Sequence, residues 1–594
     1  MDGMMRFSWI QISAGVFSLL LVVFIFIPTF GVNYGVHSDH FNLVDKLQAT
    51  PLPDGSTWLL KGNQLLSSSD YRQCCHYFIE TFWLQTIGRS LNAWIVNWYF
   101  LLYQHIQDYS VGRLVSALIL GLTGWIFFRQ LVQSLFLSIP MAATVSIGVF
   151  LLPPALLYVT WISNTVPGLI PVFFAIFCYP LIDKINFYDL MACNRRLYYF
   201  GISSILVYLT LCFIYPPNAL LVTIYPLLRL LNVKRTGWKI VRFPIIRDIV
   251  FCGLVSMIFY IIVKYVVKPI QGFLLSPYIF YVTDDPNQKY SFLLSASPLD
   301  VAVKFFESIK FGVNIWFPPQ TATHFIVFAL VIGAVAHYIL QKERQYWKID
   351  VIRIILGFIV LLLAFAPVII GRNAFLVGYR NGFVIMASVV ILVIWAGSYS
   401  GGILLEMLHS GRPVWMFRRF SRFGQARSGL TRNMRRMAWF GYGILAFLPI
   451  WMAHKHVATT VNYYGRVEQP YLERWLPNKT DSHVKTIILE HKHPHAIVPP
   501  GKQLCFLDDS HFRQCLLPEE FSTLNSLINH DHHLAMMVNN LLRERDYGRD
   551  VFLKINVVSQ YSTNRPGGAI WHVPLPTLTD IPEGKLLTFP EGTD

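Results

Sequence analysis

Long apolar segments fill most of the first 455 residues of this 594-residue chain. Only 14% of its residues are charged, whereas about a quarter are charged in a typical soluble domain. An apolar helix of about 20 residues crosses the hydrocarbon core of a bilayer. The pattern therefore predicts a polytopic α-helical membrane protein with about eleven transmembrane helices. We expect these spans near residues 8–30, 112–129, 138–159, 164–182, 198–214, 217–230, 247–267, 323–341, 352–371, 382–403 and 438–454.

The fifth and sixth predicted spans are separated by the sequence Tyr215-Pro216-Pro217-Asn218. Proline has no backbone N–H, and it disfavours the helical conformation in the residue before it. The segment could form one long kinked helix or two helices joined by a hairpin turn. We favour the hairpin because two consecutive prolines interrupt the helix more strongly than one.

Most of the surplus positive charge, +16 overall, lies in short loops between the predicted spans. Lys and Arg are enriched in cytoplasmic loops, so this charge orients the chain in a membrane and does not indicate nucleic-acid binding. We expect the N-terminus inside and the C-terminus outside the cytoplasmic (inner) membrane. The basic loops expected inside are 182–197, 229–247, 341–353 and 407–436, and the last of these also attracts anionic membrane lipid.

The loop at residues 32–111, in the membrane domain 1–455, is expected outside and holds the candidate active site. Its second half, from Cys75 to Tyr109, has aromatic residues at helical spacing. Trp and Tyr favour the membrane interface, so this pattern predicts a helix that lies along the membrane. An extra span at 91–106 is the alternative, but it is short and contains several polar residues.

Residues 456–594 are rich in Pro, Asp and His and predict an external soluble α/β domain. A helical pattern at 519–544 is followed by a strand pattern at 550–559. An external compartment permits disulfides. Cys505 and Cys515 enclose a short loop in this domain, and we expect them to be bonded to each other.

Several features together resemble the C-type glycosyltransferase superfamily and, within it, the serotype-converting O-antigen glucosyltransferases of bacteria and their phages. The resemblance covers roughly residues 1–400, and the external tail has no counterpart in it. The matching features are an acidic external loop at 37–45 after the first span, Gly88-Arg89 on an interfacial helix, Arg113 at the start of the second span, Tyr215-Pro216 at a hairpin tip and external arginines after a late span.

In that superfamily, a carboxylate of the first external loop serves the acceptor, as a general base or through a bound divalent ion. The resemblance implies this role for Asp39, with Asp70 and Glu80 as further candidates. Asp39 could instead be a solvated loop residue, and Asp70 could cap the following helix. The donor is a sugar on a polyprenyl phosphate, whose leaving phosphate Arg or Lys can stabilise. The candidate substrate-binding residues are Arg89, Arg113, Arg372, Arg380 and Tyr215.

Arg372 and Arg380 bracket a short turn that is expected outside. Their side chains can reach the headgroup layer, where the donor phosphate would lie. Ordinary interface anchoring is the alternative. Two arginines in one outer turn run against the positive-inside bias, which favours the binding role.

No cofactor is certain from the sequence, and a divalent cation is possible. His37 and His40 flank Asp39, and Asp284-Asp285 offers further oxygen ligands, so Mg²⁺ or Mn²⁺ could bind there. Histidine is a poor magnesium ligand, and an Asp-Asp-Pro sequence is more often a turn. The histidines of the tail are interpreted as a polar surface and not as a zinc site, because the two cysteines of the tail are expected to be bonded to each other.

The resemblance implies transfer of a hexose, such as glucose, from polyprenyl phosphate to a glycan or lipid-linked glycan acceptor such as O-antigen. A lipid or oligosaccharide transporter is one alternative, but the predicted spans are nearly free of charge and show no inverted repeats. A non-catalytic assembly or sensor protein would not need the aromatic loop. An O-antigen polymerase would differ by taking a whole repeat as donor. The sequence also leaves a bacterial or an endoplasmic-reticulum membrane open.

Overall fold

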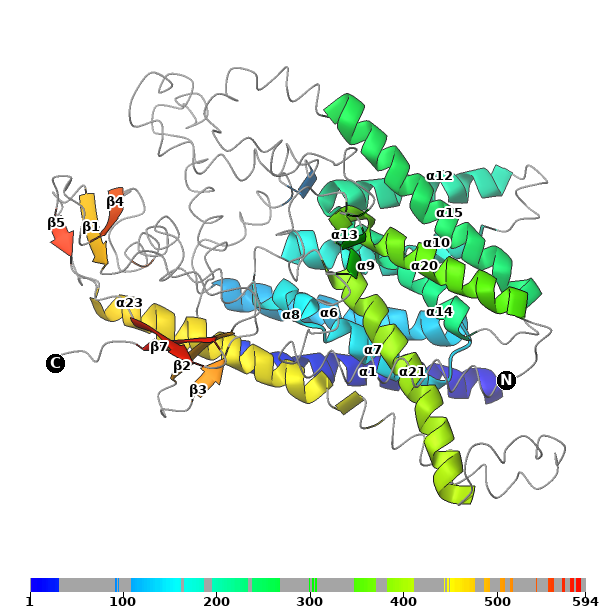
Figure 1. Cartoon of the computed structure of the whole chain (residues 1–594), viewed down its shortest axis with the longest axis horizontal. Coiled ribbons are helices and arrows are strands. Elements are labelled where there is room, and N and C mark those ends of the chain that lie inside the picture. The colour runs from blue at the N-terminus through cyan, green and yellow to red at the C-terminus, as the bar shows by residue number, and fades with distance from the viewer. Residues whose placement is uncertain are drawn as a thin grey trace. The chain divides into compact units, whose positions relative to one another are not determined.

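The computed structural model describes residues 2–30, 108–161, 165–185, 195–232, 238–267, 347–369, 382–410 and 449–475, seven strands between 486 and 588, and a few isolated residues. Most of these residues are helical (Figure 1). The helices are α1 (Asp2–Phe26), α6 (Asp108–Gln133), α7 (Ile139–Phe150), α8 (Pro153–Thr160), α9 (Ile170–Phe177), α10 (Tyr179–Asp183), α12 (Arg195–Ile214), α13 (Pro216–Ala219), α14 (Ile224–Asn232), α15 (Trp238–Ile262), α20 (Trp347–Ile369), α21 (Phe383–Ser410) and α23 (Gln469–Trp475).

Several of these helices are preceded or followed by a short 3₁₀- or π-helical segment. The 3₁₀ segments are η1 (Ile27–Thr29) and η4 (Leu220–Thr223), and the π-helical segments are η3 (Thr165–Leu169), η6 (Val263–Val267) and η11 (Asn462–Glu468).

Two described helices, Asp108–Gln133 and Val241–Val266, are long and apolar enough to cross a membrane. The pair α7 and α8 becomes a third crossing if it is counted as one span, although it bends by 57°. Our prediction of a single span at 138–159 did not include this bend, which occurs where Pro153 and Pro154 begin α8. The chain is thus a helical, membrane-compatible protein. The count of eleven crossings stays a prediction, and the expected span at 323–341 lies outside the described residues.

The predicted interruption at Tyr215 is present. Helix α12 ends at Ile214, and Tyr215 adopts an extended conformation with φ −157° and ψ 97°. Helix α13 then begins at Pro216, and the chain continues through η4 into α14. The prolines occupy the first turn of α13, where a missing N–H costs no hydrogen bond.

The chain divides into two compact units. Unit 1 comprises residues 1–21, 119–156 and 171–453, and in it α15 lies beside α12, α14 and α20 (Figure 1). Its core is aromatic: the ring of Phe127 contacts those of Phe150 and Tyr225 edge-on. The outward face of α15 stays apolar, as expected where a helix meets lipid, with Val250, Leu254, Met257 and Ile261 exposed.

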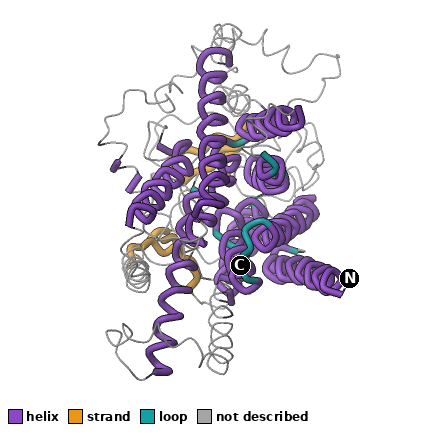
Figure 2. The backbone as a smooth tube through the Cα atoms, turned by 90° about the vertical axis from the view of Figure 1, so that its right-hand side faces the viewer, coloured by secondary structure: helices purple, strands orange, loops and turns teal. Residues whose placement is uncertain are grey.

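Unit 2 comprises residues 22–118, 157–170 and 454–594, and it contains all the described strands, shown in orange in Figure 2. One sheet has the order β4-β1-β5 with parallel neighbours, and the other has the order β3-β2-β7-β6. The strand bounds are β1 (Thr486–His491), β2 (Gln503–Leu507), β3 (Arg513–Cys515), β4 (Lys554–Ser559), β5 (Ala569–Trp571), β6 (Thr577–Ile581) and β7 (Gly584–Thr588).

The tail thus contains the strand expected at 550–559, as β4. The helix expected at 519–544 lies outside the described residues except for Leu541, which is helical. The α/β character of the tail therefore stays a prediction, while its strands and parallel pairing are shown.

Candidate functional site

The structure describes four of the ten residues that the sequence singled out: Arg113, Tyr215, Cys505 and Cys515. The candidate carboxylates and the remaining candidate arginines lie outside the described residues, as do the histidines near Asp39 and the Asp284-Asp285 pair. These are Asp39, Asp70, Glu80, Arg89, Arg372, Arg380, His37 and His40. Their roles stay predictions.

Arg113 is buried in the first turns of α6, with no exposed surface. Its Nε donates a hydrogen bond to the backbone carbonyl of Thr160, the last residue of α8, at 3.2 Å. The last carbonyls of a helix have no partner within the helix, and they carry partial negative charge. The guanidinium therefore stabilises the end of α8 and is in turn fixed in one orientation.

A pair of buried hydroxyls lies one helical turn further along α6. The Oγ of Ser116 is 3.1 Å from the Oγ1 of Thr165, the first residue of η3. Each hydroxyl also donates a hydrogen bond to a backbone carbonyl. The Ser116 hydroxyl donates to Gly112 at 2.8 Å, and the Thr165 hydroxyl donates to Tyr158 at 3.0 Å. Two hydroxyl protons thus serve three contacts, so at least one of these contacts is made without a proton.

We call Arg113, Ser116, Thr160 and Thr165 the Arg113 cluster. All four residues belong to unit 2, and all four are buried. A guanidinium presents a planar set of donors that matches the oxygens of a phosphate, and hydroxyls can add further donors. The cluster therefore has the donor chemistry that an anionic phosphate requires, in an apolar helical setting where such contacts are strong.

The packing around this cluster depends on a glycine. A Cβ added at Gly168, in η3, would lie 2.0 Å from the ring of Tyr158, closer than any real contact. The backbone of η3 can approach the aromatic side chain of α8 only because this residue has no side chain. The approach holds η3 against the end of α8, where Thr165 and Thr160 lie.

Tyr215 is buried at the junction of α12 and α13, in unit 1. Its backbone N–H donates to Leu211, and its carbonyl accepts from Asn218 and Ala219. These backbone contacts give Tyr215 a part in shaping the turn. Arg113 belongs to the other unit.

Sequence reasoning missed a network of charged residues at the ends of the unit 1 helices. We call Tyr179, Asp183, Arg229, Arg247 and Asp248 the helix-end network. Our expectation that the spans are nearly free of charge overlooked these residues, although Arg229 and Asp248 lie within predicted spans. The adjacent Arg-Asp pair at the start of an otherwise apolar segment was the available signal.

A second missed feature is the buried π-helix η11, in unit 2. In a π-helix, residues five apart are hydrogen-bonded along one face, and Tyr463 and Glu468 have this spacing. Both side chains are buried, and the Tyr463 ring packs 5.0 Å from that of Phe506 in β2. Burial, and after it the nearby Glu468 carboxylate, raises the pKa of Tyr463 well above its usual range. Glu468 is a buried carboxylate beyond the last predicted span, and no sequence pattern pointed to it.

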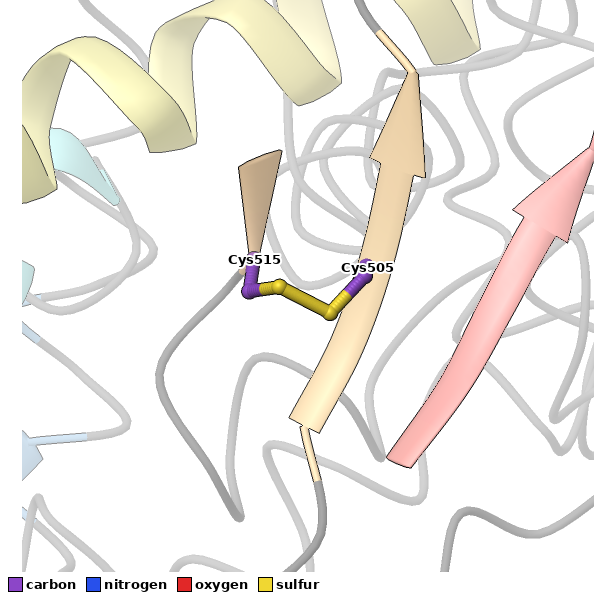
Figure 3. Close-up of a disulfide and its surroundings, with 2 residues drawn as sticks. All are labelled: Cys505 and Cys515. Carbon is purple, nitrogen blue, oxygen red and sulfur yellow. A yellow bond between two sulfur atoms is a disulfide. The ribbon is translucent and has the colours of Figure 1, made fainter. Parts of the chain in front are cut away.

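Cys505 in β2 and Cys515 in β3 form a disulfide, with an S–S distance of 2.04 Å (Figure 3). The two residues are directly paired across the antiparallel strands. The neighbouring residue Gln514 lies 3.5 Å from the side-chain nitrogen of Asn462 in η11. The disulfide hairpin therefore packs against the π-helix, through Phe506 on one strand and Gln514 on the other.

We expect Cys515→Ser to lower the free energy of unfolding of the tail by about 2–3 kcal/mol, because the unfolded chain regains the entropy of an open loop. Thermal unfolding of the purified protein, followed with and without reductant, measures this change. Cys178→Ser is the matched control because Cys178 is a free thiol. A wild-type protein whose tail unfolds at the same temperature with and without reductant would contradict the expectation.

Comparison with known proteins gives no match: no protein-family model, no curated protein and no solved structure is similar to this chain. Within the described part of the chain, no group of three or more His, Cys, Asp or Glu side chains could hold a metal ion. The functional argument therefore depends on the residues themselves.

Proposed function

We propose that this protein is a polytopic membrane glycosyltransferase that moves a hexose from polyprenyl phosphate to a cell-surface glycan. The observation that carries the proposal is the Arg113 cluster. It combines a buried guanidinium with two buried hydroxyls that lie 3.1 Å from each other. A lipid-linked phosphate is an anion that arrives within the membrane, and a site of this kind suits it.

The reaction requires a base on the acceptor side and cations on the donor side. The acceptor hydroxyl attacks C1 of the sugar, and its proton passes to the carboxylate of Asp39. The bond between C1 and the phosphate oxygen breaks, and the electron pair stays on the polyprenyl phosphate. Arg113 stabilises the charge on that phosphate, and Arg89, Arg372 and Arg380 are the further candidates for this role.

If a divalent ion binds beside Asp39, it would lower the pKa of the acceptor hydroxyl and replace the direct proton transfer. The direct base mechanism needs fewer ligands and is the one we propose.

The contacts between helix ends support the proposed topology. The span assignment puts the start of α6 and the end of α8 on the outer side, and Arg113 and Thr160 at these ends are in contact. It puts the ends of α10 and α14 and the starts of α15 and α20 on the inner side. These ends are also joined by hydrogen bonds within unit 1. Arg247 in α15 donates to the carbonyl of Asp183 in α10, and Arg353 in α20 donates to the carbonyl of Leu230 in α14.

A transporter is the second candidate function, and one observation favours it. Ionisable groups within membrane helices often mark the route of an ion or a substrate, and the helix-end network contains four of them. A route of this kind requires charges that change partners during transport. A measurement of ion flux through the wild-type protein and through Asp248→Asn separates the two functions.

The proposed function is tested by incubating membranes that contain the protein with radiolabelled polyprenyl-phosphate glucose, galactose or mannose. We expect one donor to be consumed and its sugar to appear in a glycan or lipid-linked glycan product. Membranes that contain the Arg113→Gln variant at equal abundance are the matched control. If the folded wild-type protein consumes none of these donors, with or without added Mg²⁺ or Mn²⁺, the proposal is overturned. Release of a whole oligosaccharide repeat as product would instead indicate a polymerase.

A further inference from the structure

The helix-end network joins three helices of unit 1 through short contacts between opposite charges. Arg229 in α14 lies 2.6 Å from the carboxylate of Asp183 in α10. Arg247 in α15 lies 3.0 Å from the same oxygen of Asp183. It also lies 2.8 Å from a carboxylate oxygen of Asp248, the next residue in the chain. The hydroxyl of Tyr179 donates to Asp248 at 2.9 Å and accepts from Arg229 at 3.0 Å.

The four charges of the network balance. Two arginines face two aspartates, and each aspartate contacts both arginines, the longest contact being 4.0 Å from Arg229 to Asp248. Three of the four side chains are at most 8% exposed, and Asp183 is 31% exposed. Removing one member would leave a net buried charge, which is far more costly than removing a balanced pair.

Helix α14 needs such support. It has nine residues, too few for a helix that is stable by itself in water, and it is buried from Ile224 to Leu230. Its last carbonyls receive hydrogen bonds from other helices: Arg353 in α20 donates to Leu230, and Trp395 in α21 donates to Leu231. The end of α14 is therefore fixed by its neighbours on several sides.

The network also extends toward α6 through stacked tyrosines. The rings of Tyr179 and Tyr225 lie 3.5 Å apart and within 5° of parallel. The Tyr225 hydroxyl donates to the side chain of Gln130 in α6, whose amide donates to the carbonyl of Ile176 at 2.8 Å. Residues of five helices (α6, α9, α10, α14 and α15) thus belong to one connected set of contacts.

We propose that the helix-end network is a charge-balanced clamp that holds α10, α14 and α15 together, and that it does not conduct ions or protons. Charge balance, and not any individual charge, is what the assembly of unit 1 requires. A conducting group must lose and regain its partner in each cycle, whereas every charged group here is bonded to another member of the same network. The clamp does not depend on the proposed glycosyl transfer.

The experiment compares three variants of the full-length protein: Asp248→Asn, Arg229→Met and the double variant Arg229→Met/Asp248→Asn. Each single variant leaves three charges that cannot balance, while the double variant leaves the Arg247–Asp183 pair. We expect each single variant to reduce the yield of monodisperse, detergent-solubilised protein about tenfold or more, and the double variant to restore most of it. Arg129→Gln is the matched control because Arg129 is an exposed arginine on α6, and it should leave the yield unchanged.

Three results would overturn the clamp. The first is a double variant that is recovered no better than the single variants, and the second is single variants that are recovered like the wild type. The third is proton or sodium flux through wild-type protein in liposomes that Asp248→Asn abolishes, measured with an internal pH dye or with ²²Na⁺. Absence of such flux in the wild type, together with recovery by the double variant, supports the clamp.

Discussion

Replacing Arg113 with glutamine should lower the rate of hexose transfer by about 100- to 1,000-fold, the usual effect of removing one group that stabilises developing charge. The reason is the charge that builds on the leaving phosphate as the bond to C1 breaks. Glutamine keeps a hydrogen-bond donor and most of the length of the side chain but has no positive charge. Steady-state kinetics with the lipid-linked donor that the wild-type protein consumes measures the loss.

Arg113→Lys separates charge from geometry. Lysine keeps the positive charge, but it cannot donate through Nε to Thr160 and present paired donors at the same time. We expect this variant to recover only part of the lost rate, with a raised donor KM and an unchanged acceptor KM. Arg129→Gln, at an exposed position of the same helix, should leave the kinetics unaltered.

The alternative for Arg113 is a purely structural role, because its bond to Thr160 also stabilises the end of α8. In that case Arg113→Gln would lower the melting temperature, and the protein that remains folded would transfer at the wild-type rate. Ser116→Ala gives a second readout. Under the proposed function it raises the donor KM, since a hydroxyl that can turn toward the phosphate is lost.

Local features of the fold followed from the sequence, because they depend on neighbouring residues. The consecutive prolines after Tyr215 required an interruption of the helix, and the structure has it there. The apolar pattern near 112–129 was enough to place α6, although its ends extend further on both sides. The bend between α7 and α8 was missed because Pro153 and Pro154 were included in one apolar window.

The polar contacts could not be predicted in the same way, because they join residues that are far apart in the chain. Asp183 and Arg247 are separated by 64 positions, and no local pattern relates them. A single charge in an apolar window hardly alters its hydropathy, so Arg229 and Asp248 did not change the predicted spans. The π-helix at Tyr463 and Glu468 has no sequence signature comparable to a proline, and it was missed for this reason.

In the candidate site, too, local position could be predicted from the sequence and contacts between distant residues could not. The sequence selected Arg113 from its place at the start of a span, but its partners Thr160 and Thr165 come from a different part of the chain. Asp39 was selected by its place just beyond the first span, and its role is a prediction that only kinetics can test.

Asp39→Asn should lower transfer by about 100-fold or more, because asparagine has nearly the same shape but cannot accept the proton of the acceptor hydroxyl. Expression and melting temperature should stay close to those of the wild type, since the substitution hardly changes the size of the side chain. Asp70→Asn and Glu80→Gln are the matched comparisons within the same loop, and Glu468→Gln is the comparison outside it. If one of these three abolishes transfer while Asp39→Asn does not, the base is that residue.

The pH dependence distinguishes a base from a ligand or a structural carboxylate. A general base acts only when it is ionised, so the wild-type rate should fall as the pH falls through the pKa of Asp39, and this acid limb should be absent in the residual activity of Asp39→Asn. If Asp39 instead holds a divalent ion, EDTA should abolish wild-type transfer, and Mg²⁺ or Mn²⁺ should restore it. Wild-type activity that survives EDTA, with an acid limb that Asp39→Asn removes, would assign the proton transfer to Asp39 itself.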